Sequence, residues 1–374
     1  MRVLHVVATG QRRGAEIFTA DLVGALDDVG VEQRVAVLRA SAGLAVPFRA
    51  PATVLGVDTA GVPGVRMGLP GVAGLRRLLR AFNPDVVQAH GGEALKYALA
   101  GAAGGRRQVV YRRIGSSPAW IASGPRRVVY GQLMRRATRI VAVAEAVRQE
   151  TLQVFRLPAA HVVTIPNAVD ATRLAPTRGR AAMREHLGIP ADAEVILSLG
   201  ALTWEKDPLA HVEVAARALA ERPRAWHLVA GDGPLRGQVE AAVARHGIGD
   251  RVLLAGIRSD VADFLQASDV VLFASRSEGM EGMPATVIEA GMAGLPVAGY
   301  AVAGVAEVVS SGETGLLAQP GDLGSLGGHV VAVLADPGRR RRLSEAARDR
   351  CRERFEIRAV APRYLELYER LVAA

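Results

Sequence analysis

The chain has 374 residues, which at about 150 residues per domain favours two or three domains. Hydrophobic residues make up 50% of it and charged residues 22%, so wholesale disorder is excluded and sizeable cores are expected. A single cysteine, Cys351, excludes an intramolecular disulfide and any CxxC metal site, and it predicts a reducing, cytoplasmic compartment. The sequence has no window of about 18 uninterrupted apolar residues, so no transmembrane helix is predicted.

The positive net charge belongs to the N-terminal half. Residues 1–165 contain 22 basic and 10 acidic residues, whereas residues 166–374 contain 24 and 27. Only Lys96 and Lys206 are lysines; the other 44 basic residues are arginines. A basic face of this kind can attract anionic lipid, nucleic acid or a phosphorylated acceptor. A solvated surface shaped by biased codon usage is an equally good interpretation.

Short apolar runs alternate with helix-length amphipathic segments, the pattern of parallel sheets built from βαβ units. Helices are expected in the first half, for example at Ala15–Asp28 and Gly92–Ala103. Strands are predicted in the first half at Val3–Ala8, Arg34–Leu38, Asp85–His90, Gln108–Arg112, Arg139–Val143 and His161–Ile165. A second series is predicted at Glu194–Gly200, Ala225–Ala230, Arg251–Ala255, Asp269–Ala274 and Pro296–Gly299.

These two series predict an α/β fold of two Rossmann-like, doubly wound domains that face a central cleft. We expect an N-terminal domain over residues 1–165, a linker over 166–190 and a C-terminal domain over 191–355. The linker is rich in proline and shows no clear strand. Residues 356–374 are predicted to form an amphipathic helix that packs back on the N-terminal domain. Open α/β sheets bind ligands at the carboxyl ends of their strands, where helix N-termini favour anions.

The most informative segment lies after the predicted strand Asp269–Ala274. Two carboxylates eight residues apart, Glu281 and Glu289, flank a helix expected to begin near Pro284. Backbone amides at such a helix start can hold a phosphate, while the carboxylates accept hydrogen bonds from sugar hydroxyls. A surface loop with ordinary acidic residues at a helix start is the simpler alternative.

The spacing of Glu281 and Glu289 matches the E-x7-E motif of family 4 retaining glycosyltransferases, enzymes of the GT-B fold. The runs Gly294-Leu295-Pro296-Val297 and Gly312-Glu313-Thr314-Gly315 also resemble that family, and weaker similarity extends over nearly the whole chain. The resemblance implies that Glu281 contacts the donor sugar and that Glu289 contacts the ribose of the nucleotide. It further implies that the backbone of Gly282, Met283, Pro284, Ala285 and Thr286 holds the sugar and the β-phosphate.

The resemblance assigns further site residues. Lys206 follows the strand Glu194–Gly200, and its ammonium would neutralise the departing diphosphate. Ala201 stands where the family often has an arginine, so one phosphate cation is missing or comes from elsewhere. In the N-terminal domain, Gly14 resembles the end of the family's Gly-Gly-Ala-Glu loop. His90 matches the family histidine that contacts the donor sugar, although an isolated histidine is more often structural.

The function expected from these residues is transfer of a sugar from a nucleotide diphosphate sugar to an acceptor hydroxyl, with retention of configuration and without a metal or other cofactor. The acceptor is either a lipid-linked or cell-envelope glycan or a small natural product. Peripheral membrane contact through the basic N-terminal half is a further expectation. A nucleotide-sugar epimerase, a phosphorylase-type enzyme and a basic nucleic-acid-binding protein are the alternatives. The last is disfavoured, because no nucleic-acid motif accompanies the charge.

Overall fold

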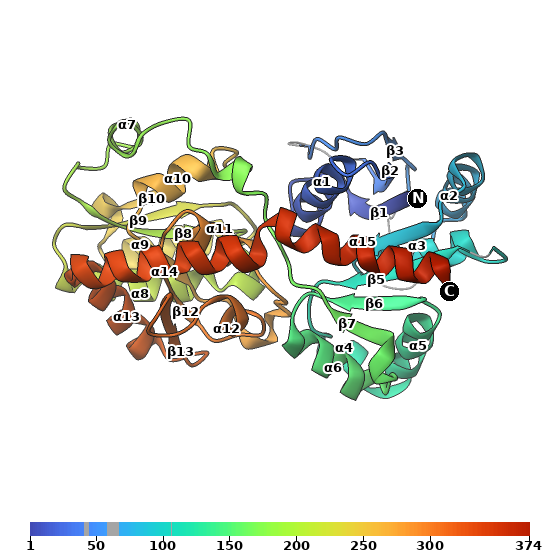
Figure 1. Cartoon of the computed structure of the whole chain (residues 1–374). Helices are drawn as coiled ribbons and strands as arrows, with labels where there is room; N and C mark the ends of the chain where they lie inside the picture. The colour runs from blue at the N-terminus through green and yellow to red at the C-terminus, as the bar shows by residue number, and fades with distance from the viewer. Residues whose placement is uncertain (41–44, 58–66, 106) are drawn as a thin grey trace. The chain divides into compact units, whose positions relative to one another are not determined.

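The structure is a computed structural model that describes residues 1–40, 45–57, 67–105 and 107–374. The chain forms two compact units, one made of Met1–Val169 with Ile357–Ala374 and the other of Asp170–Glu356. Each unit is built on a parallel sheet flanked by helices (Figure 1). Within the described residues, no helix is both long and apolar enough to cross a membrane.

Among the described residues, the first unit contains a seven-stranded sheet in the order β3-β2-β1-β4-β5-β6-β7, with all neighbours parallel. The order of the strands reverses between β1 and β4, which defines the switch point of a doubly wound sheet. The strands are β1 (Arg2–Thr9), β2 (Glu32–Arg39), β3 (Ala52–Val54), β4 (Val86–His90), β5 (Gln108–Arg113), β6 (Arg139–Ala142) and β7 (Val162–Thr164).

The helices of this unit cover both faces of the sheet, as right-handed crossovers require. They are α1 (Gly14–Asp27), α2 (Leu69–Phe82), α3 (Gly92–Ala102), α4 (Ala119–Ala122), α5 (Gly124–Arg135), α6 (Glu145–Phe155) and the C-terminal α15 (Ile357–Ala373). Helix α15 packs against α1, and Tyr364 and Tyr368 lie fully buried in the same core cluster as Phe18. The amphipathic C-terminal helix is therefore an integral layer of the first unit.

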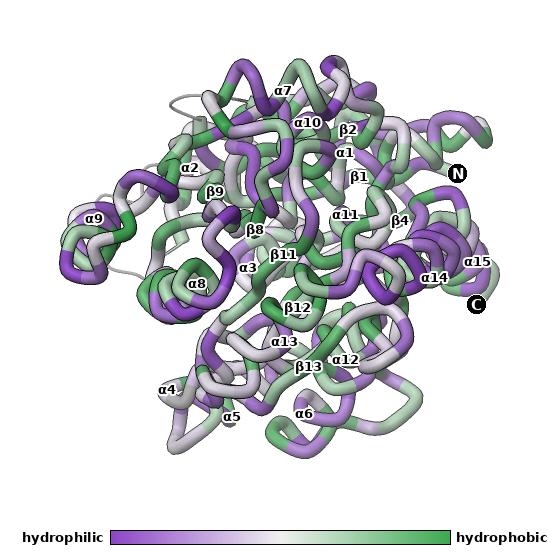
Figure 2. Tube along the Cα trace, turned by 90° about the vertical axis from the view of Figure 1, so that its left-hand side faces the viewer, coloured by the Kyte–Doolittle hydropathy of each residue, from purple (hydrophilic) through white to green (hydrophobic). Residues whose placement is uncertain are grey.

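The second unit, all of whose residues are described, has a six-stranded parallel sheet in the order β10-β9-β8-β11-β12-β13. Its strands are β8 (Glu194–Leu199), β9 (Ala225–Ala230), β10 (Val252–Leu254), β11 (Val270–Phe273), β12 (Val297–Tyr300) and β13 (Gly315–Ala318). Figure 2 shows β8, β11 and β12 largely in the hydrophobic colour, as expected for strands covered on both faces.

Helices again flank this sheet on both sides. They are α7 (Arg180–His186), α8 (Pro208–Glu221), α9 (Arg236–Arg245), α10 (Val261–Ala267), α11 (Ala285–Met292), α12 (Val305–Val308), α13 (Leu323–Ala335) and α14 (Pro337–Phe355). Helix α13 packs against α8, and α14 packs against α11. Helix α14 is mostly hydrophilic (Figure 2), and four of its side chains are buried, namely Leu343, Ala347, Cys351 and Phe355.

Every predicted strand is present to within two residues at each end, but the structure adds β3 and β13. It also changes the interpretation of residues 166–190 as a linker. Val169 lies in the first unit, where its carbonyl accepts a hydrogen bond from the backbone N–H of Ile357. Residues 170–190 belong to the second unit and include α7, with Met183 and Arg184 buried. Arg184 holds this segment in place through its ion pair with Asp269, the residue directly before β11.

Candidate functional site

Three loops meet at the carboxyl edge of the second sheet, after β8, β9 and β11. The β8 and β9 loops touch so closely that a Cβ built on Gly231 would lie 1.8 Å from the carbonyl oxygen of Gly200. A Cβ on Gly233 would lie 2.5 Å from the carbonyl oxygen of Leu202, whose backbone N–H donates to the Asp232 carbonyl at 3.0 Å. Positions 231 and 233 therefore need glycine, because the backbone of the β8 loop occupies the space that a side chain would fill.

The β8 loop carries Lys206 at the end of a short 3-10 turn, Trp204–Lys206. The next residue, Asp207, has a left-handed backbone with φ of 46° and forms the N-cap of α8, where its side chain accepts from the backbone N–H of Ala210 at 3.4 Å. A non-glycine residue holds such a conformation only when its surroundings fix it. The loop thus presents Lys206 from a tightly constrained turn.

The β11 loop brings Glu281 to Lys206. After β11 the chain forms a second 3-10 turn, Ser277–Gly279, and then Met280, with φ of 60°, redirects it. The Glu281 carboxylate forms an ion pair with the Lys206 ammonium and accepts a hydrogen bond of 3.3 Å from the Ser275 hydroxyl. The side chain of Glu281 is 13% exposed and that of Lys206 is 30% exposed, so the pair is reachable from solvent through the lysine.

The predicted phosphate-binding backbone lies at the start of α11. Gly282, Met283 and Pro284 are buried, and the Gly282 carbonyl accepts a 2.7 Å hydrogen bond from the backbone N–H of Gly304. Pro284 is the N-cap residue and provides no side-chain cap. The first N–H groups of a helix lack partners within the helix and carry partial positive charge. Ala285 and Thr286 occupy this first turn, so the segment has the geometry of an anion-binding helix start.

Glu289 is the fifth residue of α11, eight positions after Glu281 in the sequence. It is buried, and its carboxylate faces the Arg173 guanidinium at 3.6 Å. Arg173 comes from a 3-10 turn, Ala171–Leu174, at the very start of the second unit. The sequence alone gave no indication of this partner, because the two residues are more than a hundred positions apart.

Further contacts hold the β8 and β11 loops together. The Arg276 guanidinium bonds to the Asp207 carboxylate at 3.0 Å and lies over the Trp204 ring, 5.3 Å from its centroid. The backbone N–H of Arg276 donates to the Glu205 carbonyl at 3.0 Å, and a Cβ on Gly279 would meet the same carbonyl oxygen at 2.8 Å. Lys206 and Glu281 are thus carried by two turns that are fixed to each other.

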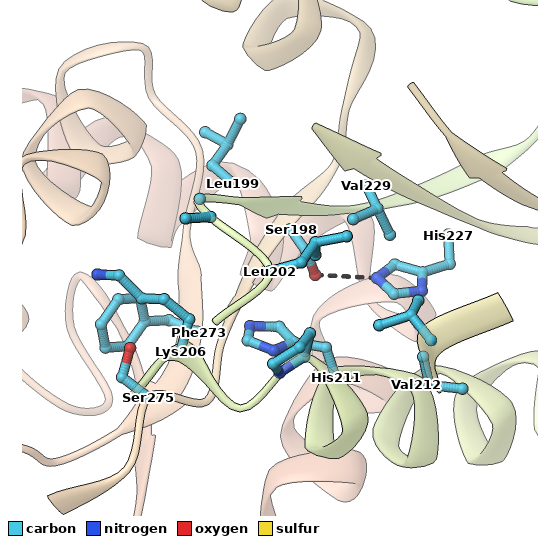
Figure 3. A pocket seen from close by; sticks show the side chains of 14 residues that line it. Ser198, Leu199, Leu202, Lys206, His211, Val212, His227, Val229, Phe273 and Ser275 are labelled. Atoms are coloured by element: carbon cyan, nitrogen blue, oxygen red, sulfur yellow. Dashed lines mark hydrogen bonds between the residues drawn. The ribbon is translucent and has the colours of Figure 1, made fainter. Parts of the chain in front are cut away.

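A pocket beside Lys206 is lined by side chains of β8 and its loop, α8, β9 and β11 (Figure 3). Its walls are mostly apolar, and its polar groups include Ser198, His211 and His227. The Ser198 hydroxyl and His227 Nε2 form a buried hydrogen bond of 2.9 Å. Burial lowers the pKa of His227 to about 3, so its ring is neutral. The pocket is lined by Ser198, Leu199, Gly200, Ala201, Leu202, Lys206, Pro208, His211, Val212, His227, Val229, Val239, Phe273 and Ser275.

The two predicted site residues of the first unit follow neighbouring strands. Gly14 is the exposed first residue of α1, after β1. His90 ends β4 and is only 2% exposed; its Nε2 bonds to His5 Nδ1 at 3.1 Å. His5 Nε2 in turn bonds to Gln33 at 3.0 Å. Burial holds the pKa of His90 well below its usual value, so His90 is a neutral member of a buried polar chain.

Another residue of the first unit acquires a role that differs from the sequence-based interpretation. Asn167, which lies in the segment predicted to be a linker, is buried and accepts a 2.8 Å hydrogen bond from Arg112. Arg112 is itself buried and its guanidinium lies 3.6 Å from the centroid of the Phe18 ring. Within the part of the chain that the structure describes, no group of three or more His, Cys, Asp or Glu side chains is arranged to hold a metal ion.

Comparison with known proteins shows the family of the chain. Residues 179–350 match the family described as Glycosyl transferases group 1, and residues 12–173 match Glycosyltransferase Family 4. The chain belongs to glycosyltransferase family 4. The 2-deoxystreptamine glucosyltransferase of Streptomyces kanamyceticus is 29% identical to this glycosyltransferase over 93% of the chain and 96% of its own length. The lipopolysaccharide core biosynthesis glycosyltransferase LpsD of Rhizobium meliloti is 28% identical over 100% of the chain and 99% of its own length.

The solved structures support the GT-B fold of this glycosyltransferase. Anabaena Alr3699/HepE, solved in complex with UDP and glucose, superposes with a TM-score of 0.83 and 22% identity, over 99% of this chain and 100% of that one. Two parallel-sheet α/β units are the architecture that GT-B enzymes share, and the sequence-based expectation of this fold class is confirmed.

Proposed function

We propose that this glycosyltransferase transfers a sugar from a nucleoside diphosphate sugar to an acceptor hydroxyl, with retention at the anomeric carbon. The observation that carries the proposal is the ion pair of Lys206 with Glu281, just before the start of α11 in the chain. The second carboxylate, Glu289, follows Glu281 by eight residues, on α11. One cation, a helix N-terminus and two carboxylates provide what a sugar nucleotide needs: positive groups for the diphosphate and hydrogen-bond acceptors for the hydroxyls on either side.

Each residue then has a defined task. Lys206 and the amides of the first turn of α11 hold the diphosphate, and Glu289 accepts from the ribose hydroxyls. Glu281 accepts from a hydroxyl of the sugar. Without the donor, Lys206 and Glu281 satisfy each other; with it, each exchanges part of that contact for the ligand. This exchange keeps both charges compensated in either state, which limits the cost of desolvation.

In the proposed reaction the bond between the anomeric carbon and the β-phosphate oxygen breaks, and the acceptor oxygen bonds to the same carbon from the same face. The acceptor proton passes to the departing phosphate oxygen. The protein contributes positioning and charge neutralisation, so the rate depends on how firmly Lys206 is held. Because Lys206 and the helix amides provide the positive groups, we propose that transfer needs no divalent cation.

The comparisons favour certain substrates. HepE was solved in complex with UDP and glucose, and the full-length relative from Streptomyces is named for glucosylation of 2-deoxystreptamine. We therefore propose a hexose donor on UDP and a small polyhydroxylated acceptor of the aminocyclitol type. The relative LpsD makes a cell-envelope glycan the second candidate acceptor.

Thermal unfolding of the purified protein with UDP-, GDP-, ADP- and dTDP-sugars tests the donor. A ligand at a hundred times its Kd stabilises a protein by about 2.7 kcal/mol. We expect one nucleotide class to raise Tm in the wild type and to do so much less in a Glu289→Ala variant. An equal rise in both proteins would contradict the assignment of the ribose site. Conversion of the donor to an isomer in the absence of any acceptor would support the epimerase instead.

One feature favours additional contact with an anionic membrane surface. Residues 94–144 contain ten basic residues and no acidic one, and of these ten Arg112 and Arg113 are buried. On this stretch, α4 and α5 expose Trp120, Val128 and Val129, and Arg126 lies over the Trp120 ring at 5.5 Å. Aromatic and aliphatic side chains between arginines suit a bilayer interface. We propose peripheral contact here, to be tested by cosedimentation with phosphatidylglycerol vesicles. Equal binding to neutral phosphatidylcholine vesicles, or no loss with Trp120→Ser, would argue against it.

A further inference from the structure

His211 connects the two loops that carry Lys206 and Glu281. It lies in the first turn of α8, partly buried, and lines the pocket beside Lys206 (Figure 3). Its Nδ1 is 3.0 Å from the carbonyl oxygen of Asp207, at the end of the β8 loop. Its Nε2 is 3.3 Å from the backbone nitrogen of Ala274, where the β11 loop begins. One imidazole therefore bridges two loops that are 67 residues apart in sequence.

The two contacts fix the tautomer of the ring. A carbonyl oxygen can only accept and a backbone N–H can only donate, so Nδ1 carries the proton and Nε2 accepts from Ala274. Burial lowers the pKa of His211 below its usual value, which keeps the ring in the neutral form that this bridge requires. The bridge is thus a defined pair of hydrogen bonds, one to each loop.

The residues at each end of the bridge are themselves fixed. Asp207 keeps its left-handed backbone while its carbonyl accepts from the His211 ring and backbone N–H, and its carboxylate accepts from Arg276. Ala274 is fully buried, so its N–H has no access to water. Loss of the imidazole would leave this N–H without its acceptor and would free Asp207 on one side. Lys206, one residue before Asp207, would lose its defined position relative to Glu281.

We propose that His211 is a positioning residue for sugar transfer: by tying Asp207 to Ala274, it holds Lys206 against Glu281 in the geometry that receives the diphosphate. This role rests on the proposed function of Lys206 and Glu281. It also has a structural consequence that can be tested without any activity: the environment of Lys206 depends on the two hydrogen bonds of His211.

Because the chain has only two lysines, NMR of labelled lysines can report on the environment of Lys206 directly. Reductive methylation with ¹³C-formaldehyde keeps the charge and labels Lys96, Lys206 and the N-terminus. We expect His211→Leu, which removes both hydrogen bonds, to shift and broaden the Lys206 methyl resonance while Lys96 stays unchanged. His211→Gln, which can again present an acceptor to Ala274, should restore the Lys206 resonance. A Lys96→Arg variant assigns the signals.

His227→Leu is the matched control. His227 lies in the same pocket and is fully buried, but its hydrogen bond to Ser198 joins two neighbouring strands and connects no loops. We expect His227→Leu to lower thermal stability at least as much as His211→Leu while leaving the Lys206 resonance in place. If His211→Leu unfolds the protein, His211→Gln and His211→Asn provide the comparison, because asparagine cannot reach Ala274.

Kinetics separate this proposal from the proposed function. With UDP-glucose as donor, we expect His211→Leu to lower kcat between about tenfold and a hundredfold, as for a misplaced catalytic contact, with a smaller change in KM. His211→Gln should recover most of it. An unchanged Lys206 resonance together with unchanged kcat in folded His211→Leu would overturn the positioning role. A wild type that neither binds nor transfers any sugar nucleotide would instead refute the proposed function, while the Lys206 resonance would still decide the structural claim.

Discussion

The substitution Lys206→Met examines the proposed mechanism most closely. Methionine keeps most of the side-chain length and removes the charge. Removing one preorganised donor from a developing negative charge costs about 10² to 10³ in kcat. The lysine side chain is 30% exposed, so water screens part of its field and the loss should lie near the lower limit, about a hundredfold.

The same substitution also affects stability. It removes the ion-pair partner of Glu281, whose side chain is 13% exposed and which keeps the 3.3 Å hydrogen bond from the Ser275 hydroxyl. Loss of a partner from a largely buried acceptor costs about 1–3 kcal/mol, and the remaining hydrogen bond from Ser275 places the loss near the lower limit. We therefore expect a modest drop in Tm together with the large drop in kcat.

The assay compares steady-state transfer and thermal unfolding in the wild type, Lys206→Met and Lys96→Met. Lys96, whose ammonium lies 5.4 Å from the centroid of the Tyr130 ring, is the matched control, because it is the other lysine of the chain and belongs to the first unit. We expect Lys96→Met to retain kcat. A Lys206→Met variant that transfers sugar at the wild-type rate would refute the role of this ammonium in stabilising the leaving group.

Three other predictions follow from the second unit. Gly231→Ala would place a Cβ 1.8 Å from the Gly200 carbonyl oxygen and should abolish donor binding or folding. Gly237→Ala, on α9, would place a Cβ with no atom beyond its own helix within 4 Å and should stabilise the protein by about 0.5–1 kcal/mol. Thermal unfolding measures both effects. Arg184→Met should destabilise by about 1–3 kcal/mol in urea unfolding, because the carbonyls of Ala191, Ala193 and Ala267 lose the guanidinium that donates to them, while Asp269 keeps its ion pair with Arg180. His227 has a pKa of about 3 when folded and near 6.5 when unfolded, so the unfolded chain binds more protons between these values. Stability should therefore fall as pH drops below about 6.5, by at most about 1.4 kcal/mol per pH unit from this residue, and His227→Leu should flatten the slope.

The strands that could be predicted from the sequence are those that are covered on both faces of the sheet. The β4 strand is entirely buried and β8 almost so, and such strands appear as continuous apolar runs. The edge strand β3 is exposed along its whole length and only three residues long, so its sequence carried no such pattern. The segment around α7 was interpreted as a linker because of its prolines. It is held by Arg184 and Met183, two buried residues that nothing in their local sequence distinguishes from a solvated helix.

The site was accessible only in part. The spacing of Glu281 and Glu289 and the rarity of lysine directed attention to three of its residues. Their partners, Arg173 and Ser275, and the bridging His211 could not be found in this way, because each contact joins segments that only the strand order brings together. Tertiary hydrogen bonds of this kind leave no local periodicity, whereas turn glycines such as Gly231 do leave a recognisable mark.

The central claim is retaining transfer from a sugar nucleotide, and the anomeric configuration of the product tests it most directly. The purified protein would be incubated with UDP-α-glucose and 2-deoxystreptamine, and the product examined by NMR alongside that of Glu281→Gln. We predict an α-linked glucoside from the wild type and strongly reduced product from the variant, with EDTA making no difference to either. A β-linked product, or the same yield from Glu281→Gln as from the wild type, would contradict the mechanism.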